Sequence, residues 1–164
     1  MNILYTTYCK IPIGIAKIVG DNHGIQKVSI LDNDAIAKEK LLLETPACLQ
    51  ECVLQLKEYF EGKRTSFDLV VNPKGSSFQI KVWKELLTIP YGKTRSYLEQ
   101  SRALGEVKAI RAVASANGKN PLWIIIPCHR VIGSDGSLTG YAGGIWRKKW
   151  LLAHENPVKQ QSLF

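Results

Sequence analysis

A thiol, an imidazole and a guanidinium follow one another at Cys128, His129 and Arg130, directly after Pro127. The thiolate is the reactive form of cysteine, and a free cysteine has a pKa of about 8.5, so it needs a nearby base or positive charge at neutral pH. His129 can be that base if Pro127 turns the chain, because adjacent side chains on a regular strand point to opposite faces. The triplet therefore predicts a nucleophilic site, against the simpler interpretation of Cys128 as a small buried apolar residue.

A carboxylate is needed to orient the imidazole if His129 works as a base. After His129 the sequence holds two acidic residues, Asp135 and Glu155. Glu155 closes the stretch "RKKWLLAHE", whose apolar spacing predicts a helix with one buried side. We expect Glu155 to be the third member, although spacing alone does not separate it from Glu85 or Glu99.

Other roles for the cysteine–histidine pair need partners elsewhere in the chain. A metal site needs further ligands, and none follows the pair at metal-binding spacing. A cysteine protease pairs its thiol with a distant histidine, for which His23 and His154 are the candidates. Cys48 and Cys52, one helical turn apart, are either half of a metal site or two core thiols, and the lack of a second ligand pair favours core thiols. We expect no metal and no cofactor.

The excess positive charge lies in the second half of the chain. Residues 1–72 hold 8 Lys and Arg against 9 Asp and Glu, whereas residues 73–164 hold 14 against 5. This distribution predicts a module that binds a polyanion, although a solvated basic surface without a partner has the same charge. The N-terminus lacks a signal-peptide pattern, no run approaches the roughly 18 apolar residues of a membrane span, and the cysteines form no disulfide-like framework. We therefore expect an intracellular protein that does not enter a membrane.

The first half has the pattern of strands followed by a helix. Alternating isoleucines and the turn residues "GDNHG" (20–24) predict strands within residues 1–31. From Pro46, apolar side chains recur at helical spacing: Leu49, Val53, Leu56 and Phe60. "SFDLVV" (66–71) is expected to be another strand. "NPKGSS" (72–77) interrupts the pattern where the charge changes, so we predict a domain over 1–72, a linker over 73–76 and a second domain over 77–164.

The second half is expected to be mainly helical. A helix over 77–89, with Phe78, Val82, Trp83, Leu86 and Leu87 as its apolar residues, is followed by two short helices around a turn at Gly105. This pattern suggests a helix-turn-helix. The second short helix carries small side chains (Ala109, Ala112, Ala114, Ser115 and Ala116), with Arg111 as the long one. Such a surface fits either close approach to a partner or tight packing in a bundle. The apolar run Trp123–Ile126 predicts a buried strand that delivers the reactive triplet.

The segment "IPCHRVIGSDGSLTGYAGGIWRKKWLLAHE" (126–155) resembles the signature of the O6-alkylguanine-DNA alkyltransferases, a family of suicidal DNA-repair proteins. A chance Pro-Cys-His-Arg is expected in roughly one in ten thousand chains of this size. "IPYGKTRSY", "RAVASANGKNP" and "GYAGG" fit the same family. The resemblance covers about residues 77–156. It implies an α/β N-terminal domain, ribonuclease H-like with a small sheet and a helix, and a mainly α, winged-helix-like C-terminal domain containing a helix-turn-helix.

The resemblance also implies a catalytic role for five residues. Cys128 would accept the alkyl group, and His129 would act as its base through a bridging water, held by Glu155. Asn120 would brace the turn before the cysteine. Tyr97 would hydrogen-bond and protonate the guanine ring as it leaves.

The resemblance further implies which groups hold the substrate. The carbonyls of Cys128 and Val131 would accept hydrogen bonds from the guanine amine, and the N–H of Ala142 would donate to the alkylated oxygen. Tyr141 and Trp146 would line the alkyl pocket. These residues follow from the resemblance alone.

Contacts with DNA are implied for the helix-turn-helix, which the family places in the minor groove. Arg111 would enter the duplex in place of the flipped nucleotide, because an alkylated base inside a duplex cannot reach a buried thiol. Ala109, Ala112 and Ser115 would lie against the DNA, with Arg130 as a further contact. Ala114 stands where the family usually has glycine.

The function that the resemblance implies is direct reversal repair. Cys128 would irreversibly take the alkyl group from O6-alkylguanine, and from O4-alkylthymine, in double-stranded DNA, and each molecule would react once. We expect a monomer without a cofactor, cytoplasmic and associated with the nucleoid in a prokaryote, or nuclear in a eukaryote. Two alternatives are a non-catalytic alkylated-DNA-binding protein, whose known relatives lack the cysteine, and a helix-turn-helix regulator, which leaves Cys128 and His129 unexplained.

Overall fold

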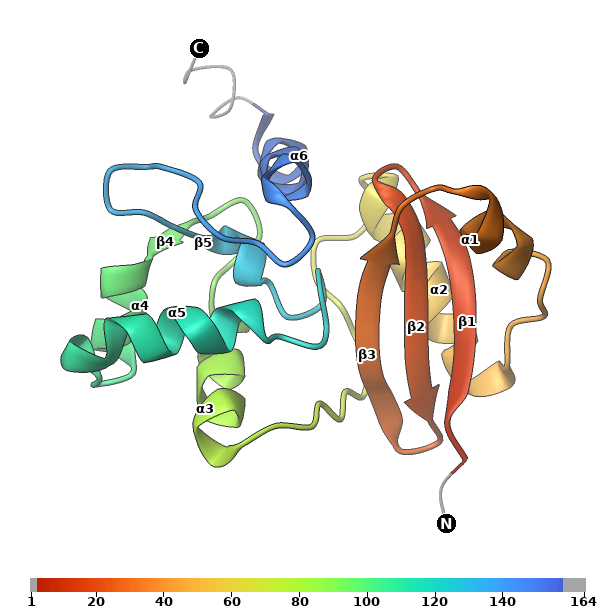
Figure 1. Ribbon diagram of the computed structural model, residues 1–164, viewed down its shortest axis with the longest axis horizontal. Coiled ribbons are helices and arrows are strands. Elements are labelled where there is room, and N and C mark those ends of the chain that lie inside the picture. Colours follow the sequence, from red (N-terminus) through yellow and green to blue (C-terminus); the bar gives the residue numbers. More distant parts are fainter. Residues whose placement is uncertain (1–2, 158–164) are drawn as a thin grey trace. The chain divides into compact units, whose positions relative to one another are not determined.

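The computed structural model describes residues 3–157 and divides the chain into two compact units (Figure 1). The first unit ends at Lys74 and also includes Pro121–Ile125. The second comprises Gly75–Asn120 and resumes at Ile126. The first break lies inside the linker expected at 73–76, whereas the sequence did not predict that 121–125 belongs to the first unit.

The first unit is built on a three-stranded antiparallel sheet in the order β1-β2-β3. Its strands are β1 (Tyr5–Ile11), β2 (Gly14–Asp21) and β3 (Gly24–Leu31). The strands expected within residues 1–31 are therefore confirmed. One detail differs, because Ile13 lies in the turn between β1 and β2, where Pro12 favours a turn and Gly14 has a φ of 140°.

A helix packs on one face of this sheet (Figure 1). It is α2 (Ala47–Phe60), and it begins after Pro46 as expected. Its buried apolar side chains are Leu49, Cys52, Leu56 and Tyr59. The sequence predicted Val53 and Phe60 on the buried face, but both are only half-buried, and the residues directly before them, Cys52 and Tyr59, are buried instead. A short helix that was not predicted, α1 (Ala35–Lys40), begins where the Asp34 carboxylate accepts a hydrogen bond from the N–H of Ala37.

Each of the two segments expected to be strands forms only one isolated β-bridge, and both bridges are to β3, the edge strand of the sheet. Val71 bridges Ile25, and Leu122 bridges Val28. The predictions of a strand over 66–71 and of a buried strand over Trp123–Ile126 were therefore wrong. The second run is apolar and largely buried, but it forms a turn in which Ile124 has a φ of 74°, a left-handed conformation that a strand does not contain.

The second unit is mainly helical. Its helices are α3 (Ser77–Leu86), α4 (Tyr97–Ala103), α5 (Ile110–Gly118) and α6 (Ile145–Glu155), with a short 3₁₀ turn η1 (Val107–Ala109) before α5. Ser76 with Gln79 and Ser96 with Glu99 form capping boxes that fix where α3 and α4 begin. Gly105, with a φ of 73°, allows the turn of the expected helix-turn-helix.

The helix expected over 77–89 ends earlier than predicted and buries only part of its apolar set. Val82, Trp83 and Leu86 are buried, whereas Phe78 is half-buried and Leu87 is 50% exposed. The indole N–H of Trp83 donates to the carbonyl of Ala116 at 2.9 Å, which joins α3 to α5. Ala116 therefore faces the core of this unit, whereas its small size had also suggested contact with a partner.

A two-stranded parallel sheet brings distant parts of the second unit together. Its strands are β4 (Arg95–Ser96) and β5 (Val131–Ile132). β4 leads directly into α4, and β5 directly follows the 3₁₀ turn η2 (Cys128–Arg130). The start of α4 is thereby held beside the reactive triplet.

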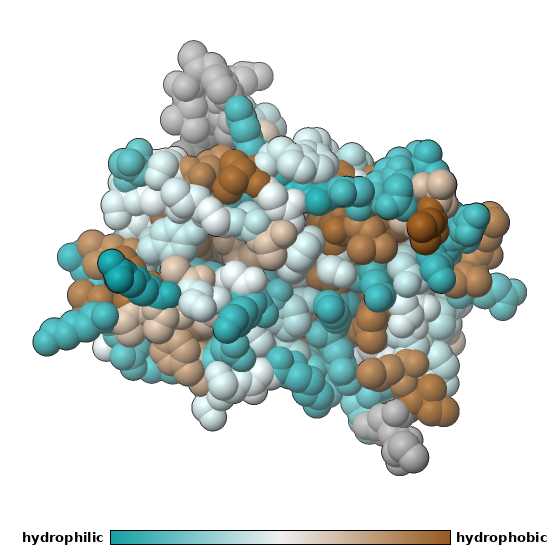
Figure 2. All heavy atoms as spheres, viewed as in Figure 1, coloured by the Kyte–Doolittle hydropathy of each residue, from teal (hydrophilic) through white to brown (hydrophobic). Residues whose placement is uncertain are grey.

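Exposed apolar side chains gather mainly in the first unit. Ile3, Leu4, Ile36, Leu42 and Leu43 are each more than half exposed. Figure 2 shows apolar surface interspersed with polar groups on the side where α1 lies. Among residues 3–157, none of the helices combines the length and apolar content of a membrane-spanning helix.

Candidate active site

The reactive triplet lies in the 3₁₀ turn η2, which begins after Pro127. A 3₁₀ turn has three residues per turn, so its successive side chains point in different directions rather than to opposite faces as on a strand. Cys128, His129 and Arg130 are 9%, 0% and 7% exposed. The expected turn after Pro127 is present, and it buries all three functional groups.

Glu155, from the end of α6, holds both residues that follow the cysteine. Its Oε2 lies 2.7 Å from Nε2 of His129. Arg130 donates through Nε to Oε1 at 2.8 Å and through Nη2 to Oε2 at 3.1 Å. Burial alone would raise the pKa of Glu155, but His129 and Arg130 outweigh it and hold that pKa well below its usual range. Glu155 is therefore a buried carboxylate anion.

His129 is kept neutral by its surroundings. Burial lowers its pKa, and the attraction of Glu155 only partly opposes this effect. Because Arg130 already balances the charge of Glu155, a proton on His129 would add an uncompensated buried charge. Nε2 is occupied by Glu155, and Nδ1 makes no hydrogen bond to the protein within residues 3–157. Nδ1 is thus the nitrogen that can accept a proton.

The thiol of Cys128 is buried as a neutral group. Burial raises its pKa, while a hydrogen bond from Asn120 and the charge of Lys148 act in the opposite direction. Asn120 also donates to the carbonyl of Ile126 at 2.7 Å, which braces the turn before the cysteine. A thiol in this state needs a base at the moment of reaction.

Lys148 is a site residue that the sequence analysis missed. It is fully buried, and its Nζ donates to the carbonyls of Thr139 at 2.9 Å and Gly140 at 3.2 Å. Burial lowers its pKa to about 8, against the opposing attraction of Cys128. The signal in the sequence was its position seven residues before Glu155, which places both residues on one helical face together with Leu151.

A cavity of ≈490 Å³ opens onto Cys128. The residues that line it come from α4, α5, η2 and the loop before α6: Tyr97, Ile110, Arg111, Ala114, Asn117, Gly118, Cys128, Thr139, Gly140, Tyr141 and Ala142. The hydroxyl of Tyr97 donates to the carbonyl of Thr139 at 2.8 Å, so Tyr97 and Lys148 hold the same loop. The phenol of Tyr141 has a raised pKa, chiefly because it is buried.

Two residues expected at the substrate do not line this cavity. Trp146 is 55% exposed, its ring lies 4.5 Å from the guanidinium carbon of Arg147, and its assignment to the alkyl pocket stays a prediction. It follows Gly144 at the start of α6, where the helix directs Lys148, and not Trp146, to the buried side. Val131 lies fully buried in β5 behind the cysteine, with its N–H donating to the Cys128 carbonyl.

The expected DNA-contacting residues divide into two groups. On α5, Arg111, Ala112 and Ser115 are exposed, and Ala109, just before the helix, is half-buried. Arg130 was assigned wrongly, because it is buried. Its guanidinium is used by Glu155 and by the carbonyl of Ile89, to which Nη1 donates at 2.6 Å.

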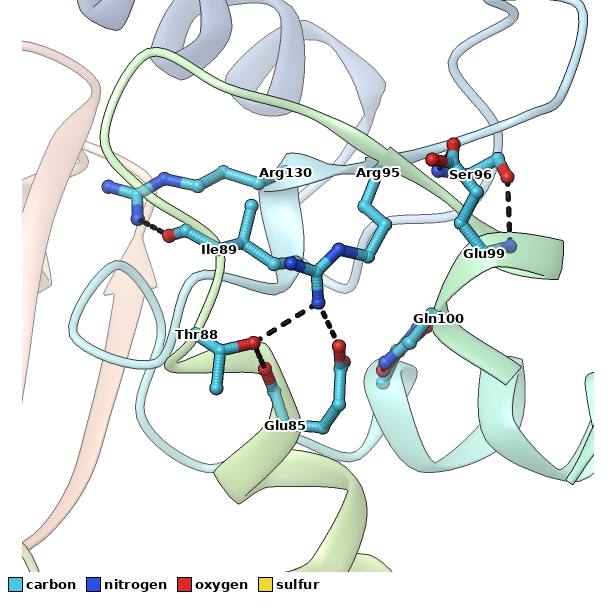
Figure 3. Close-up of polar contacts among 9 residues, drawn as sticks. Glu85, Thr88, Ile89, Arg95, Ser96, Glu99, Gln100 and Arg130 are labelled. Atoms are coloured by element: carbon cyan, nitrogen blue, oxygen red, sulfur yellow. Dashed lines mark hydrogen bonds and ion pairs between the residues drawn. The ribbon is translucent and has the colours of Figure 1, made fainter. Parts of the chain in front are cut away.

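The two other carboxylates considered as partners of His129, Glu85 and Glu99, make different contacts. Glu99 closes the capping box of α4. Glu85 forms an ion pair with Arg95, which also donates to Thr88 (Figure 3). Neither carboxylate is placed on His129, so the choice of Glu155 agrees with the geometry.

The remaining cysteines and histidines do not form a second site. Residues 3–157 contain no group of three or more His, Cys, Asp or Glu side chains arranged to hold a metal ion. Cys48 is half-buried and Cys52 is buried in α2. Of the two histidines considered for a protease, His154 stacks on Trp150 and His23 lies in the turn between β2 and β3.

Comparison with known proteins finds one family over nearly the whole chain. Residues 77–157 match the family model described as "6-O-methylguanine DNA methyltransferase, DNA binding domain", and residues 3–73 match the corresponding "ribonuclease-like domain". A methylated-DNA–protein-cysteine methyltransferase of Methanosarcina barkeri is 45% identical over 159 residues, which cover 93% of this chain and 97% of the relative. One from Mycolicibacterium paratuberculosis is 43% identical over 152 residues, covering 93% and 92%.

Solved structures give the same result. The O6-methylguanine methyltransferase of Mycobacterium tuberculosis is similar with a TM-score of 0.82 and 42% identity, over 94% of each chain. A structure of the M. tuberculosis protein OGT in complex with DNA gives a TM-score of 0.82 and 43% identity, over 93% of this chain and 92% of that one.

Proposed function

The chain belongs to the 6-O-methylguanine DNA methyltransferase family and repairs DNA by direct reversal, and we propose that the buried thiol of Cys128 takes up the alkyl group with His129 as its base. The observation that carries this assignment is the buried His129 ring, which directly follows Cys128 in η2 and is held through Nε2 by the Glu155 carboxylate of the ion pair with Arg130. Nδ1 is free to accept the thiol proton, and Glu155 stabilises the imidazolium that forms. The family resemblance implies that a water carries the proton between the two.

The transfer step exchanges one bond for another. The Cys128 thiolate attacks the alkyl carbon, the new C–S bond forms, and the C–O6 bond breaks with its electron pair remaining on the guanine oxygen. Tyr97 lines the cavity, and its hydroxyl, which donates to the Thr139 carbonyl in the structure, turns in this proposal to give a proton to the leaving ring. The proton that His129 took from the thiol then restores the Tyr97 hydroxyl, so the net result moves one proton from the thiol to guanine and leaves a thioether. Because a thioether resists hydrolysis, each protein molecule reacts once.

Lys148 supports the same step through charge and position. Its ammonium acts to lower the pKa of Cys128, so it favours the thiolate as that anion develops. Its hydrogen bonds also hold Thr139 and Gly140, which line the cavity beside Tyr141 and Ala142. A loop held in this way keeps the Ala142 N–H where it can donate to the alkylated oxygen.

The substrate reaches the cavity as a flipped nucleotide of a duplex. The cavity is lined by α5, the second helix of the helix-turn-helix, and Arg111 lies both at the cavity and on the exposed side of this helix. Small exposed side chains at Ala112 and Ser115 allow the helix backbone to come close to DNA. Arg111 then fills the space that the flipped base leaves.

The finer assignments are also proposals. O6-alkylguanine is the main damage, and O4-alkylthymine is a second substrate because it offers the same alkoxy group on a smaller ring. A monomer, as expected from the sequence, is part of the same proposal. The free thiols at Cys9, Cys48, Cys52 and Cys128 suit the reducing cytoplasm, at the nucleoid of a prokaryote, or the nucleus of a eukaryote.

Incubation with duplexes that carry isotopically labelled O6-methylguanine or O4-methylthymine tests these proposals. The protein should gain one methyl group, mapped by mass spectrometry to Cys128, and product should reach a plateau at one group per molecule. Cys128→Ala should abolish labelling while duplex binding persists. Label on Cys9 or Cys52 would contradict the assignment, since burial raises the pKa of these thiols to about 11 and about 12. Light scattering on the same sample measures the oligomeric state, and a larger species would contradict the monomer.

A further inference from the structure

Gln100 of α4 and Asn117 of α5 are joined by a reciprocal pair of hydrogen bonds. Gln100 Nε2 donates to Asn117 Oδ1, and Asn117 Nδ2 donates to Gln100 Oε1, both at 2.7 Å. Gln100 is 0% exposed and Asn117 is 6% exposed. Buried amides cost free energy unless their polar atoms are paired, and here each amide uses its oxygen and one N–H on the other.

The two partners differ in their relation to the alkyl cavity. Asn117 is one of the residues that line it, together with Ile110, Ala114 and Gly118 on the same side of α5, whereas Gln100 is not. Because the oxygen and one N–H of Asn117 are used by Gln100, at most one N–H of this amide is left for the cavity. The α5 wall beside Cys128 is therefore less polar than its sequence suggests.

The position of Gln100 is fixed from its other side as well. Gln100 also acts to lower the pKa of Glu85, although burial raises that pKa overall. Glu85 is in turn paired with Arg95, which precedes α4 (Figure 3). On the other side of Asn117, the carbonyl of Ala116 is held by Trp83. The amide pair is thus part of a fixed framework and has little freedom to turn.

We propose that the Gln100–Asn117 pair determines which alkyl groups react, by engaging the oxygen and one N–H of Asn117 so that apolar groups are favoured over hydroxyl-bearing groups of the same size. This inference rests on the proposed transfer to Cys128. A hydroxyl that enters the cavity gives up its hydrogen bonds to water, and on the α5 wall the oxygen and one N–H of Asn117 are already used by Gln100. The resulting discrimination is on the order of ten-fold in transfer rate.

A matched pair of substrates isolates this effect. Duplexes with O6-propylguanine or O6-(2-hydroxyethyl)guanine carry substituents with the same number of heavy atoms, which differ only in a terminal methyl or hydroxyl group. The wild-type protein should transfer the propyl group about ten times faster. Gln100→Met removes the partner of Asn117, whose amide edge is then available to a hydroxyl in the cavity. The ratio of the two rates should fall several-fold, toward unity.

Asn117→Leu is the matched control, because leucine has a similar branched shape and no polar edge. It should keep the propyl preference, and the double variant Gln100→Met/Asn117→Leu should keep it too. The double variant should also be more stable than either single variant, since replacing both members of a buried polar pair leaves neither unpaired. A merely structural pair would lower stability in the single variants and leave the rate ratio unchanged.

The outcomes separate this inference from the proposed function. If wild-type protein is alkylated at Cys128 but transfers the hydroxyethyl group as fast as the propyl group, the inference is wrong and the function stands. An unchanged ratio in Gln100→Met, or a ratio that falls equally in Asn117→Leu, also overturns it. If Gln100→Met does not fold, the wild-type and Asn117→Leu ratios still decide the question. Absence of transfer from every substrate would refute the proposed function itself.

Discussion

Glu155 Oε2 lies 2.7 Å from Nε2 of His129, and the same carboxylate receives two hydrogen bonds from Arg130, the next residue of the chain. One buried anion therefore orients the imidazole of His129 and is itself neutralised by a cation. Because Arg130 already balances the charge of Glu155, His129 remains neutral although it contacts this carboxylate. A neutral imidazole can take the thiol proton, which an imidazolium could not.

Arg130→Met should both destabilise the fold and move the pH profile of transfer. Removing one partner of a buried ion pair costs about 3–5 kcal/mol, which chemical denaturation measures. With Arg130 absent, Glu155 attracts a proton to His129 more strongly, so the pKa of His129 rises and the acid limb of the transfer rate shifts to higher pH. Arg130→Lys keeps the charge but not the forked donor geometry, and should give smaller changes in both quantities. A destabilised variant with an unshifted rate profile would argue against this control of His129.

The stability of the protein should fall as the pH drops below about 6.5. The folded pKa of His129 is lower than its ordinary value of 6.5, so between the two values the unfolded chain binds a proton that the folded chain does not. Stability therefore rises with pH across this window, by at most about 1.4 kcal/mol per pH unit for one group. Glu155 extends the loss to lower pH, because its folded pKa lies below its ordinary value of 4.5.

Urea unfolding at a series of pH values measures this dependence. His129→Gln retains a donor for Glu155 but does not titrate, so its profile should lose the contribution between the folded pKa of His129 and 6.5. Identical slopes for the variant and the wild type in that range would show that His129 is not the group responsible.

Lys148→Met should slow alkyl transfer without lowering stability. The variant loses the charge that favours the Cys128 thiolate and the hydrogen bonds that hold the loop, and a decrease of roughly ten- to a hundred-fold corresponds to about 1.4–2.8 kcal/mol. Stability should be maintained, because the lowered pKa of Lys148 reflects the cost of burying its charge, and the exposed residues Thr139 and Gly140 can turn to water. Lys149→Met removes the same charge from an exposed position of α6 and serves as the control. Equal slowing in both variants would indicate a general effect of charge on DNA binding.

Arg111→Ala should slow transfer from a duplex but not from a free base. Without the arginine the flipped nucleotide tends to re-stack, and unstacking costs a few kcal/mol, so a decrease of on the order of ten- to a thousand-fold is expected with duplex substrate. Transfer from free O6-benzylguanine needs no flipping and should be nearly unchanged, provided that the cavity accepts the benzyl group. Tyr97→Phe removes the hydroxyl at the base itself and should slow both reactions. Equal slowing of both substrates by Arg111→Ala would remove the case for a role in flipping.

Local features of the fold were predictable because their causes are local. Gly105 between two short amphipathic segments indicated the helix-turn-helix, and alternation around "GDNHG" indicated the β2–β3 hairpin. The two strand predictions failed for the opposite reason, because the pairing that decides them is not local. Val71 and Leu122 each pair at a single position with the edge of β3, and an apolar run does not reveal how far a ladder will extend.

The site was predictable where adjacent residues carry the chemistry. The sequence by itself determined that a thiol, an imidazole and a guanidinium follow a proline at 127, and this local order predicts Cys128 and His129 as partners in one reaction. Glu155 was selected as a plausible third member among several carboxylates, but nothing in the spacing excluded Glu85 or Glu99.

Only the tertiary structure decided what the charged side chains of the site contact. Arg130 belongs to Glu155 rather than to DNA, and Lys148, not Trp146, lies on the buried side of α6 beside the loop that lines the cavity. The physical reason is that the free energy of burying a charge depends on which partners the rest of the fold brings within hydrogen-bond distance. Those partners come from segments far apart in the chain, and neither composition nor spacing specifies them.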